Sequence, residues 1–321
     1  MTAVGVLPAP LSPYTYFIRA DKHYEQMKDM ICLVTGASSG LGFAMAQGLA
    51  KTGATLVMLC RDRKRGRKAR IKLIAGSGNP KIDLAPCDLS SQEDVRRFAA
   101  EFKAFYPHLD VLANLAGVRY PRHRLTPDGI EYNLATNVVG PFLLTTLLLE
   151  PLQAAGRAAV VNVSGESHRT GAIHFDDLQL IRYFTPAEAA GQTAMARVLW
   201  TYELARRLMG TGITANTFCP GWTRSHLLRY YPAVIRWPRQ LAARLLAAPA
   251  EVSMQPVIDF TLQGALDGQT GCYLSEGALV KSVPITYRST LGRRLWLQLE
   301  KLTATEGYVR ETDREMRALP Y

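Results

Sequence analysis

Three glycines near the start of the chain have the spacing of a turn that binds phosphate. Gly36, Gly40 and Gly42 follow a short apolar run, ICLVT, and precede an amphipathic stretch that extends to about Lys51. Glycines let the backbone turn tightly and approach a pyrophosphate, and the N-terminus of the following helix supplies amide donors and partial positive charge. The pattern therefore predicts a dinucleotide site between a strand and a helix.

The next apolar run ends in an arginine where proteins that select NAD usually carry an acid. A guanidinium at Arg61 favours the 2′-phosphate of NADP(H) over the free ribose hydroxyls of NAD(H). Ser38 and Ser39 could add hydroxyl donors to that phosphate. We therefore expect NADP(H) as the cofactor. Asp88, after the third run, either faces the adenine ring or serves as an acid at a helix N-terminus.

The cysteines and histidines indicate neither a disulfide framework nor a metal site. The five cysteines are odd in number, widely spaced and mostly within or beside apolar runs, so we expect reduced thiols in the core. The six histidines do not have the spacing of metal ligands. No metal is expected.

The elements that must position these groups alternate between strands and helices. Near-continuous apolar strands separated by helices predict a parallel sheet covered on both faces, the doubly wound Rossmann arrangement of an α/β protein. The strand candidates are 31–35, 55–59, 82–86, 111–114, 158–163, 214–219 and 272–274. We expect a single domain at 30–285, preceded by an arm at 1–29 and followed by a helical extension at 286–321.

Composition narrows the class of protein further. Of 321 residues, 48% are hydrophobic and 20% are charged, which is typical of a globular protein with a sizeable core. The longest apolar run, 138–149, is too short to cross a bilayer, and the N-terminus lacks the pattern of a signal peptide, so we expect a cytoplasmic protein. The net charge of +11 is densest at 61–70, where a solvated helix beside a phosphate-bearing cofactor explains it without nucleic acid.

Two further segments suggest partners. Residues 222–248 lie after the sixth strand and mix aromatic residues with five arginines. We interpret this segment as a lid over a largely apolar small-molecule substrate, with peripheral membrane contact or a plain packing helix as alternatives. Apolar residues recur at helical spacing through 190–209, so one face of that helix packs on the sheet or on a second subunit, and a homodimer stays open.

These motifs resemble the short-chain dehydrogenase/reductase family, in particular its retinol-dehydrogenase-like branch. The matching segments are TGASSGLG (35–42), CRD (60–62), CDL (87–89), NLAG (114–117), NVVGPFLLT (137–145), VVNVSG (160–165), VLWTYELARRL (198–208), CPG (219–221) and RRLWLQLEKLT (293–303). They are co-linear and span nearly the whole chain. The resemblance implies cofactor contacts from Gly36, Ser38, Ser39, Gly40, Leu41, Gly42, Arg61, Asp88, Leu89, Asn114, Ala116, Gly117, Pro220, Gly221 and Thr223.

The family's redox groups are absent from the matching positions. The resemblance implies a serine at Gly165, a tyrosine at Ala190 and a lysine at Ala194, and only Asn137 remains of the family's catalytic tetrad. Of the fourteen tyrosines only Tyr24 has a lysine four residues later, and it precedes the first strand. Since a positioned acid or base contributes roughly 10² to 10⁴ in rate, generic carbonyl reduction should be slow.

Other side chains could take over acid–base chemistry. Glu166 follows Gly165 directly and could point into the vacated space, or it is a surface or salt-bridged carboxylate. Ser164 is a second candidate, with a strand-end hydrogen bond as the alternative. His168 is a third, with a structural role as the alternative.

Three functional hypotheses follow. The first is an atypical enzyme that binds NADP(H), with or without use of its redox chemistry, and catalyses a cyclisation, isomerisation or elimination on a hydrophobic small molecule of secondary metabolism. The second is an NADP(H)-dependent oxidoreductase with another proton donor. The third is a non-catalytic NADP(H)-binding protein.

Overall fold

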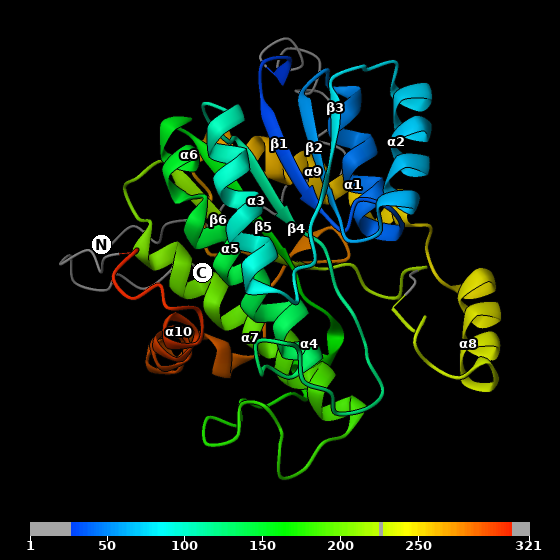
Figure 1. Ribbon diagram of the computed structural model, residues 1–321, viewed down its shortest axis with the longest axis vertical. Coiled ribbons are helices and arrows are strands. Elements are labelled where there is room, and N and C mark those ends of the chain that lie inside the picture. The colour runs from blue at the N-terminus through cyan, green and yellow to red at the C-terminus, as the bar shows by residue number, and fades with distance from the viewer. Residues whose placement is uncertain (1–26, 225–226, 310–321) are drawn as a thin grey trace, which may run out of the picture.

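The computed structural model describes residues 27–224 and 227–309, apart from the side chains of 264–267. Its centre is one sheet with the strand order β3-β2-β1-β4-β5-β6-β7-β8, parallel except for the last pair (Figure 1). The strands are β1 (Ile31–Thr35), β2 (Thr55–Cys60), β3 (Ile82–Pro86), β4 (Val111–Asn114), β5 (Ala158–Val163), β6 (Ile213–Cys219), β7 (Tyr273–Ser275) and β8 (Ala278–Leu279). The predicted doubly wound α/β fold is confirmed, and only the short β8 was not expected.

Helices connect the parallel strands and cover both faces of the sheet. The longer α-helices are α1 (Gly40–Lys51), α2 (Arg63–Ser77), α3 (Gln92–Phe105), α5 (Gly140–Leu147), α7 (Pro186–Arg207), α8 (Ala233–Leu246), α9 (Ala250–Asp267) and α10 (Ser289–Thr303). Shorter pieces are α4 (Tyr132–Leu134), η3 (Ala135–Val139), α6 (Leu149–Ala154), η4 (Glu166–Arg169) and η5 (Pro284–Tyr287). Of these, η3 is a π-helical turn and η4 and η5 are 3₁₀ turns.

Alternation along the strands divides the core into two apolar layers. In β1, Leu33 packs with the layer under α3, α5 and α7, whereas Cys32 and Val34 pack with the layer under α1 and α9. This follows from the pleat of a strand, whose successive side chains point to opposite faces. Helix α10 packs outside α7 through Trp296 and neighbouring leucines. All five cysteines are free thiols, and four of them are buried.

The strand order reverses direction between β1 and β4, and both strands end at the same edge of the sheet. Ligands of doubly wound sheets bind beyond the carboxyl ends of the strands at such a point. Most of the expected arm and the end of the expected extension lie outside the described residues. Within the described residues, no helix combines the length and apolarity needed to cross a bilayer.

Candidate functional site

The glycine turn after β1 forms a close-packed cradle. Gly36 has φ +70°, a conformation that favours glycine, and a Cβ there would lie 2.9 Å from the Cα of Ala116. A Cβ on Gly42 would lie 2.4 Å from the main-chain oxygen of Gly36. Any larger side chain at either position would push the turn apart. The cradle and the start of α1 therefore leave main-chain amides available to a pyrophosphate.

The loop after β4 is anchored to the same turn. The hydroxyl oxygen of Thr35 accepts hydrogen bonds from the amides of Leu115 and Ala116, at 2.9 and 3.0 Å. Asn114 is placed differently from the expectation: its side chain is buried and donates to Thr145 and Asn162. It therefore braces neighbouring elements and is not among the residues that line the cavity.

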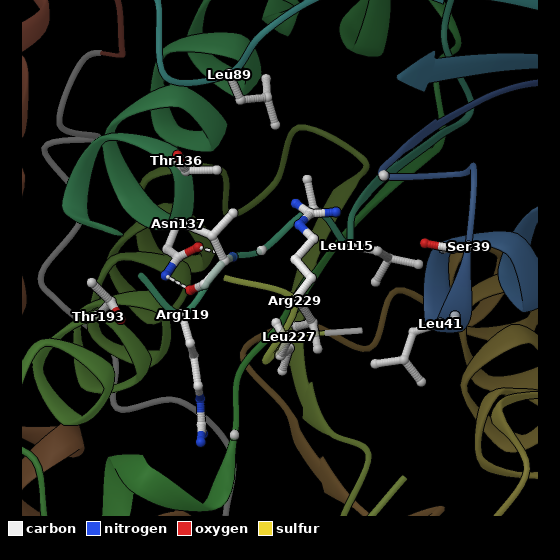
Figure 2. A pocket seen from close by; sticks show the side chains of 18 of the residues that line it. Ser39, Leu41, Leu89, Leu115, Arg119, Thr136, Asn137, Thr193, Leu227 and Arg229 are labelled. Atoms are coloured by element: carbon white, nitrogen blue, oxygen red, sulfur yellow. Dashed lines mark hydrogen bonds between the residues drawn. The ribbon is translucent and has the colours of Figure 1, made fainter. Parts of the chain in front are cut away.

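A cavity of about 860 Å³ extends from this cradle across the strand ends. Figure 2 shows Ser39 and Leu41 on one side of it and Thr136, Asn137 and Thr193 on the other, with Leu227 and Arg229 appearing between them in this view. Of the residues assigned to the cofactor, those that line the cavity are Gly36, Ser38, Ser39, Gly40, Leu41, Gly42, Arg61, Asp88, Leu89, Ala116, Gly117, Pro220, Gly221 and Thr223.

Two arginines form a basic corner at the end of β2. Arg61 and Arg65 both line the cavity, and the guanidinium of Arg65 donates to the Ser39 hydroxyl at 3.5 Å. Arg61 donates to the hydroxyls of Tyr132 and Tyr230. Asp88 is 4.0 Å from Arg61 and accepts from the amide and hydroxyl of Ser90. The corner has the charge and donors that a 2′-phosphate requires. Arg65 is a residue that the sequence analysis did not single out.

The opposite end of the cavity carries small, apolar side chains. Gly165, Ala190 and Ala194, from the end of β5 and from α7, all line it. Gly165 is extended, and a Cβ there would have the Ser167 hydroxyl, at 3.9 Å, as its nearest neighbour. There is thus open space at the position where the resemblance implies a serine.

The hydroxyl groups at this end donate to carbonyls of α7. Ser164 donates to the main-chain oxygen of Ala194 at 3.0 Å, and Ser167 donates to that of Ala190 at 3.1 Å. Thr193 donates to the oxygen of Ala189 at 2.7 Å. An uncharged hydroxyl whose proton is committed to a carbonyl is a poor proton donor to a ligand. Ser164 also lines the cavity, and its bond to Ala194 is the kind of strand-end hydrogen bond named as its alternative.

Glu166 and His168 have distinct environments. Glu166 lines the cavity, accepts from the Cys219 thiol at 3.1 Å and pairs with Arg169 at 2.6 Å. The thiol hydrogen bond, together with the arginine, lowers the pKa of Glu166, which is therefore a carboxylate at neutral pH. His168 is buried, its Nδ1 lies 2.9 Å from the oxygen of Gly165, and burial lowers its pKa. It is not among the cavity-lining residues.

Comparison with known proteins identifies the family. The model for "short chain dehydrogenase" matches residues 30–233. Retinol dehydrogenase 11 of Mus musculus is 34% identical over 271 residues, which cover 84% of this chain and 85% of that protein. Polyprenol dehydrogenase of Homo sapiens is 32% identical over 281 residues, covering 86% and 85%.

The chain belongs to the short-chain dehydrogenase family. Among solved structures, the RhlG/NADP active-site complex of Pseudomonas aeruginosa is 26% identical, with a TM-score of 0.61 and coverage of 77% of this chain and 94% of that one. Solved members of the fold have thus been crystallised with NADP, in agreement with the nucleotide cradle described above.

This short-chain dehydrogenase chain also has a buried cation that sequence reasoning missed. Arg197, one turn after Ala194 on α7, donates to the main-chain oxygens of Asn137 at 2.5 Å, Val163 at 2.8 Å and Ala116 at 2.6 Å. The side chain of Asn137 in turn bonds both main-chain groups of Val118, at 2.8 and 2.9 Å. An arginine within a helical stretch of otherwise apolar and small residues was the available signal.

The segment expected to form a lid divides into two parts in this family member. Trp222, Thr223, Leu227, Arg229 and Tyr230 line the cavity, whereas no residue of α8 does so. Helix α8 stands apart at the edge of the molecule and has no buried residue (Figure 1). Within the described residues there is also no cluster of three or more histidine, cysteine, aspartate or glutamate side chains that could hold a metal ion.

Proposed function

We propose that this protein binds NADP(H) and acts on an apolar small molecule by cyclisation, isomerisation or elimination, without the serine, tyrosine and lysine of its family. One observation carries the proposal. Gly165, Ala190 and Ala194 line the substrate end, and among the described residues the cavity has no lysine and one tyrosine, Tyr230, which is bonded to Arg61 in the basic corner.

The choice of cofactor rests on the basic corner. Arg61 and Arg65 line the cavity just after the end of β2, and Arg65 donates to Ser39. A 2′-phosphate on the adenine ribose of a bound cofactor would extend toward this corner. The cradle fits the cofactor as well. Gly36 and Gly42 are packed so closely that neither position has room for a side chain, so the main chain of the turn stays open to a pyrophosphate. NADPH, when bound, would supply a hydride or serve as part of the pocket floor. The chain itself supplies the cradle, the arginines and the apolar walls.

Proton transfer to a carbonyl is the step that this site supports least. Ser164 and Thr193 donate to helix carbonyls, and Glu166 is ionised. Holding a flexible substrate in a reactive shape is worth up to roughly 7 to 11 kcal/mol in favourable cases. A reaction that needs orientation more than a strong acid is therefore the one that these walls favour.

Binding and turnover must be measured separately. We expect isothermal titration to show NADPH binding, and we expect mass spectrometry to show rearranged products of unchanged oxidation state when polyketide-like or terpenoid-like substrates are added. The NADPH concentration should stay constant during the reaction. Brisk oxidation of NADPH with a simple hydrophobic aldehyde would contradict the proposal.

A hydride-transfer reaction on an activated acceptor is the second candidate, because the relatives named above are dehydrogenases and the cofactor cradle is intact. Water or the substrate would then provide the proton. Loss of NADPH matched one to one by a reduced alkene or iminium product identifies this case. Tight NADPH binding with no product in either assay identifies a non-catalytic protein.

We also propose that helix α8 lies on an anionic lipid surface. Val234, Trp237, Leu241 and Leu245 recur at helical spacing and are 79%, 69%, 60% and 76% exposed. They form one apolar stripe, which is the pattern of a helix that lies in a membrane interface. The segment 222–248 contains five arginines and no acidic residue, which complements anionic headgroups.

Vesicle sedimentation tests this contact. We expect binding to phosphatidylserine-containing vesicles, weaker binding to pure phosphatidylcholine, and loss of binding in the double variant Trp237→Glu, Leu241→Glu. Ile71 is exposed on α2, so Ile71→Glu is a matched control that should keep binding. Equal binding of all three proteins would contradict the proposal, as would a concentration-dependent dimer that forms through α8 and binds no lipid.

A further inference from the structure

Arg197 places a charged group in the interior, beside the nucleotide cradle. The residue is 7% exposed, and burial lowers its pKa to about 10, so it is protonated at neutral pH. Its Nε and both terminal nitrogens each donate to one main-chain oxygen, at the ends of β4 and β5 and in η3. These three bonds hold the guanidinium plane in one orientation.

No carboxylate of the described residues pairs with this charge. Asp62 and Asp88 lie at the basic corner, and Glu166 is turned to Arg169 and Cys219. A buried charge without a counter-ion costs several kcal/mol, which carbonyl dipoles offset only in part. A site that keeps such a charge is a candidate for binding the opposite charge.

The guanidinium also retains donors. An arginine carries five N–H groups, and the three carbonyls use three of them, which leaves one hydrogen on each terminal nitrogen. Arg197 lines the cavity with Ala194 and Gly117, and a Cβ on Gly117 would lie 3.8 Å from its Nη2. The charge thus borders the space where the family's phenol and ammonium are missing.

We propose that Arg197 forms an oxyanion site at the substrate end of the cavity, and that the substrate is an apolar molecule with a carboxylate or a readily formed enolate. The inference rests on the proposed function, because it specifies the substrate class of the same cavity. The walls beside the charge are Ala190, Ala194 and Leu227, which suit an alkyl or ring portion. The proposed function assigns the basic corner to the cofactor phosphate, and Arg197 is the cavity-lining arginine that lies one turn from Ala194, with two N–H groups left to orient the ligand.

Binding of matched probes to the NADPH-loaded protein tests the site. Decanoate and decanamide have the same length and differ in charge, so this pair tests binding of a carboxylate. The enolate of dimedone, compared with neutral cyclohexanone, tests binding of an enolate. Isothermal titration should give decanoate a Kd about tenfold or more below that of decanamide. Equal affinities of the two in the wild-type protein would overturn the proposal.

Variants locate the charge that is responsible. Arg197→Gln should abolish the preference for decanoate, whereas Arg119→Gln and Arg229→Gln, at two other cavity-lining arginines, should keep it. Loss of the preference in either control variant, with its survival in Arg197→Gln, would contradict the assignment. If Arg197→Gln does not fold, the two control variants and Arg197→Lys decide: the preference must persist in all three.

The readout separates this inference from the proposed reaction. Probe affinity is measured without turnover, so brisk NADPH-dependent carbonyl reduction would contradict the non-redox reaction while leaving the decanoate preference intact. Equal probe affinities with a rearranged product of unchanged oxidation state would contradict only the oxyanion site.

Discussion

The guanidinium of Arg197 donates through Nε to the main-chain oxygen of Asn137 at 2.5 Å, and this contact joins helix α7 to the π-helical turn η3. Two further bonds from the same side chain reach Ala116 and Val163. One side chain on α7 therefore joins the turn η3, the loop after β4 and the end of β5, and all three bonded residues line the cavity.

Replacing Arg197 by methionine should lower stability, because three main-chain oxygens lose their donor. We expect the free energy of unfolding to fall by about 3 kcal/mol, since buried groups left unsatisfied cost about 1 to 3 kcal/mol each and removal of the buried charge returns part of that. Urea unfolding measures the change. Arg119→Met is the control, since no hydrogen bond joins Arg119 to the described residues; equal losses in both variants would contradict the role of the three bonds.

Restoring the family's groups should create carbonyl reduction. The triple variant Gly165→Ser, Ala190→Tyr, Ala194→Lys has room at its first position, where a Cβ meets no atom closer than 3.9 Å. We expect NADPH-dependent reduction of a hydrophobic aldehyde to rise by about 10³ or more. The matched variant with Ala190→Phe should stay inactive. Activity of the phenylalanine variant equal to that of the tyrosine variant would show that the alignment of α7 is wrong.

Selectivity for NADPH over NADH should depend on the basic corner. Charge-assisted hydrogen bonds to the 2′-phosphate would be lost in Arg61→Ala and in Arg65→Ala, so each should weaken NADPH binding by about 10- to 100-fold. Affinity for NADH should change little, because it lacks that phosphate. Arg67→Ala, on the exposed side of α2, should leave both affinities unchanged. A parallel loss of NADPH and NADH affinity would contradict the assignment of the corner.

The pairing of Glu166 with Cys219 and Arg169 should make stability depend on pH. Because the pKa of Glu166 is lowered in the folded state, its carboxylate stabilises the fold above its ordinary pKa of about 4.3, and this contribution is lost as pH falls through the lower folded value. Thermal unfolding should therefore distinguish Glu166→Gln from wild type at neutral pH and not in strong acid. If the stability difference between the two proteins grew as pH fell, the protonated form of the Glu166 carboxyl would be the one that stabilises the fold, which would contradict this prediction.

Much of this molecule follows from local sequence pattern. The alternation of apolar strands and helices predicted the doubly wound sheet, because a parallel strand buried on both faces must be apolar throughout. The spacing of Gly36, Gly40 and Gly42 predicted the cradle, since a side chain at Gly36 or Gly42 would meet the main chain and Gly40 has a positive φ that favours glycine. Arg61 was singled out because it directly follows an apolar strand, and in the fold it follows β2 and lines the cavity.

Tertiary structure decided what local pattern does not encode. Asn114 belongs to the expected NLAG segment, yet its buried side chain bonds Thr145 and Asn162, which only folding brings near. Arg197 is separated by 60 residues from Asn137 and by 81 from Ala116, so no spacing rule relates them. The position of this charge in the cavity depends on α7 lying against the ends of β4 and β5. Only long-range packing of the whole sheet brings these elements together.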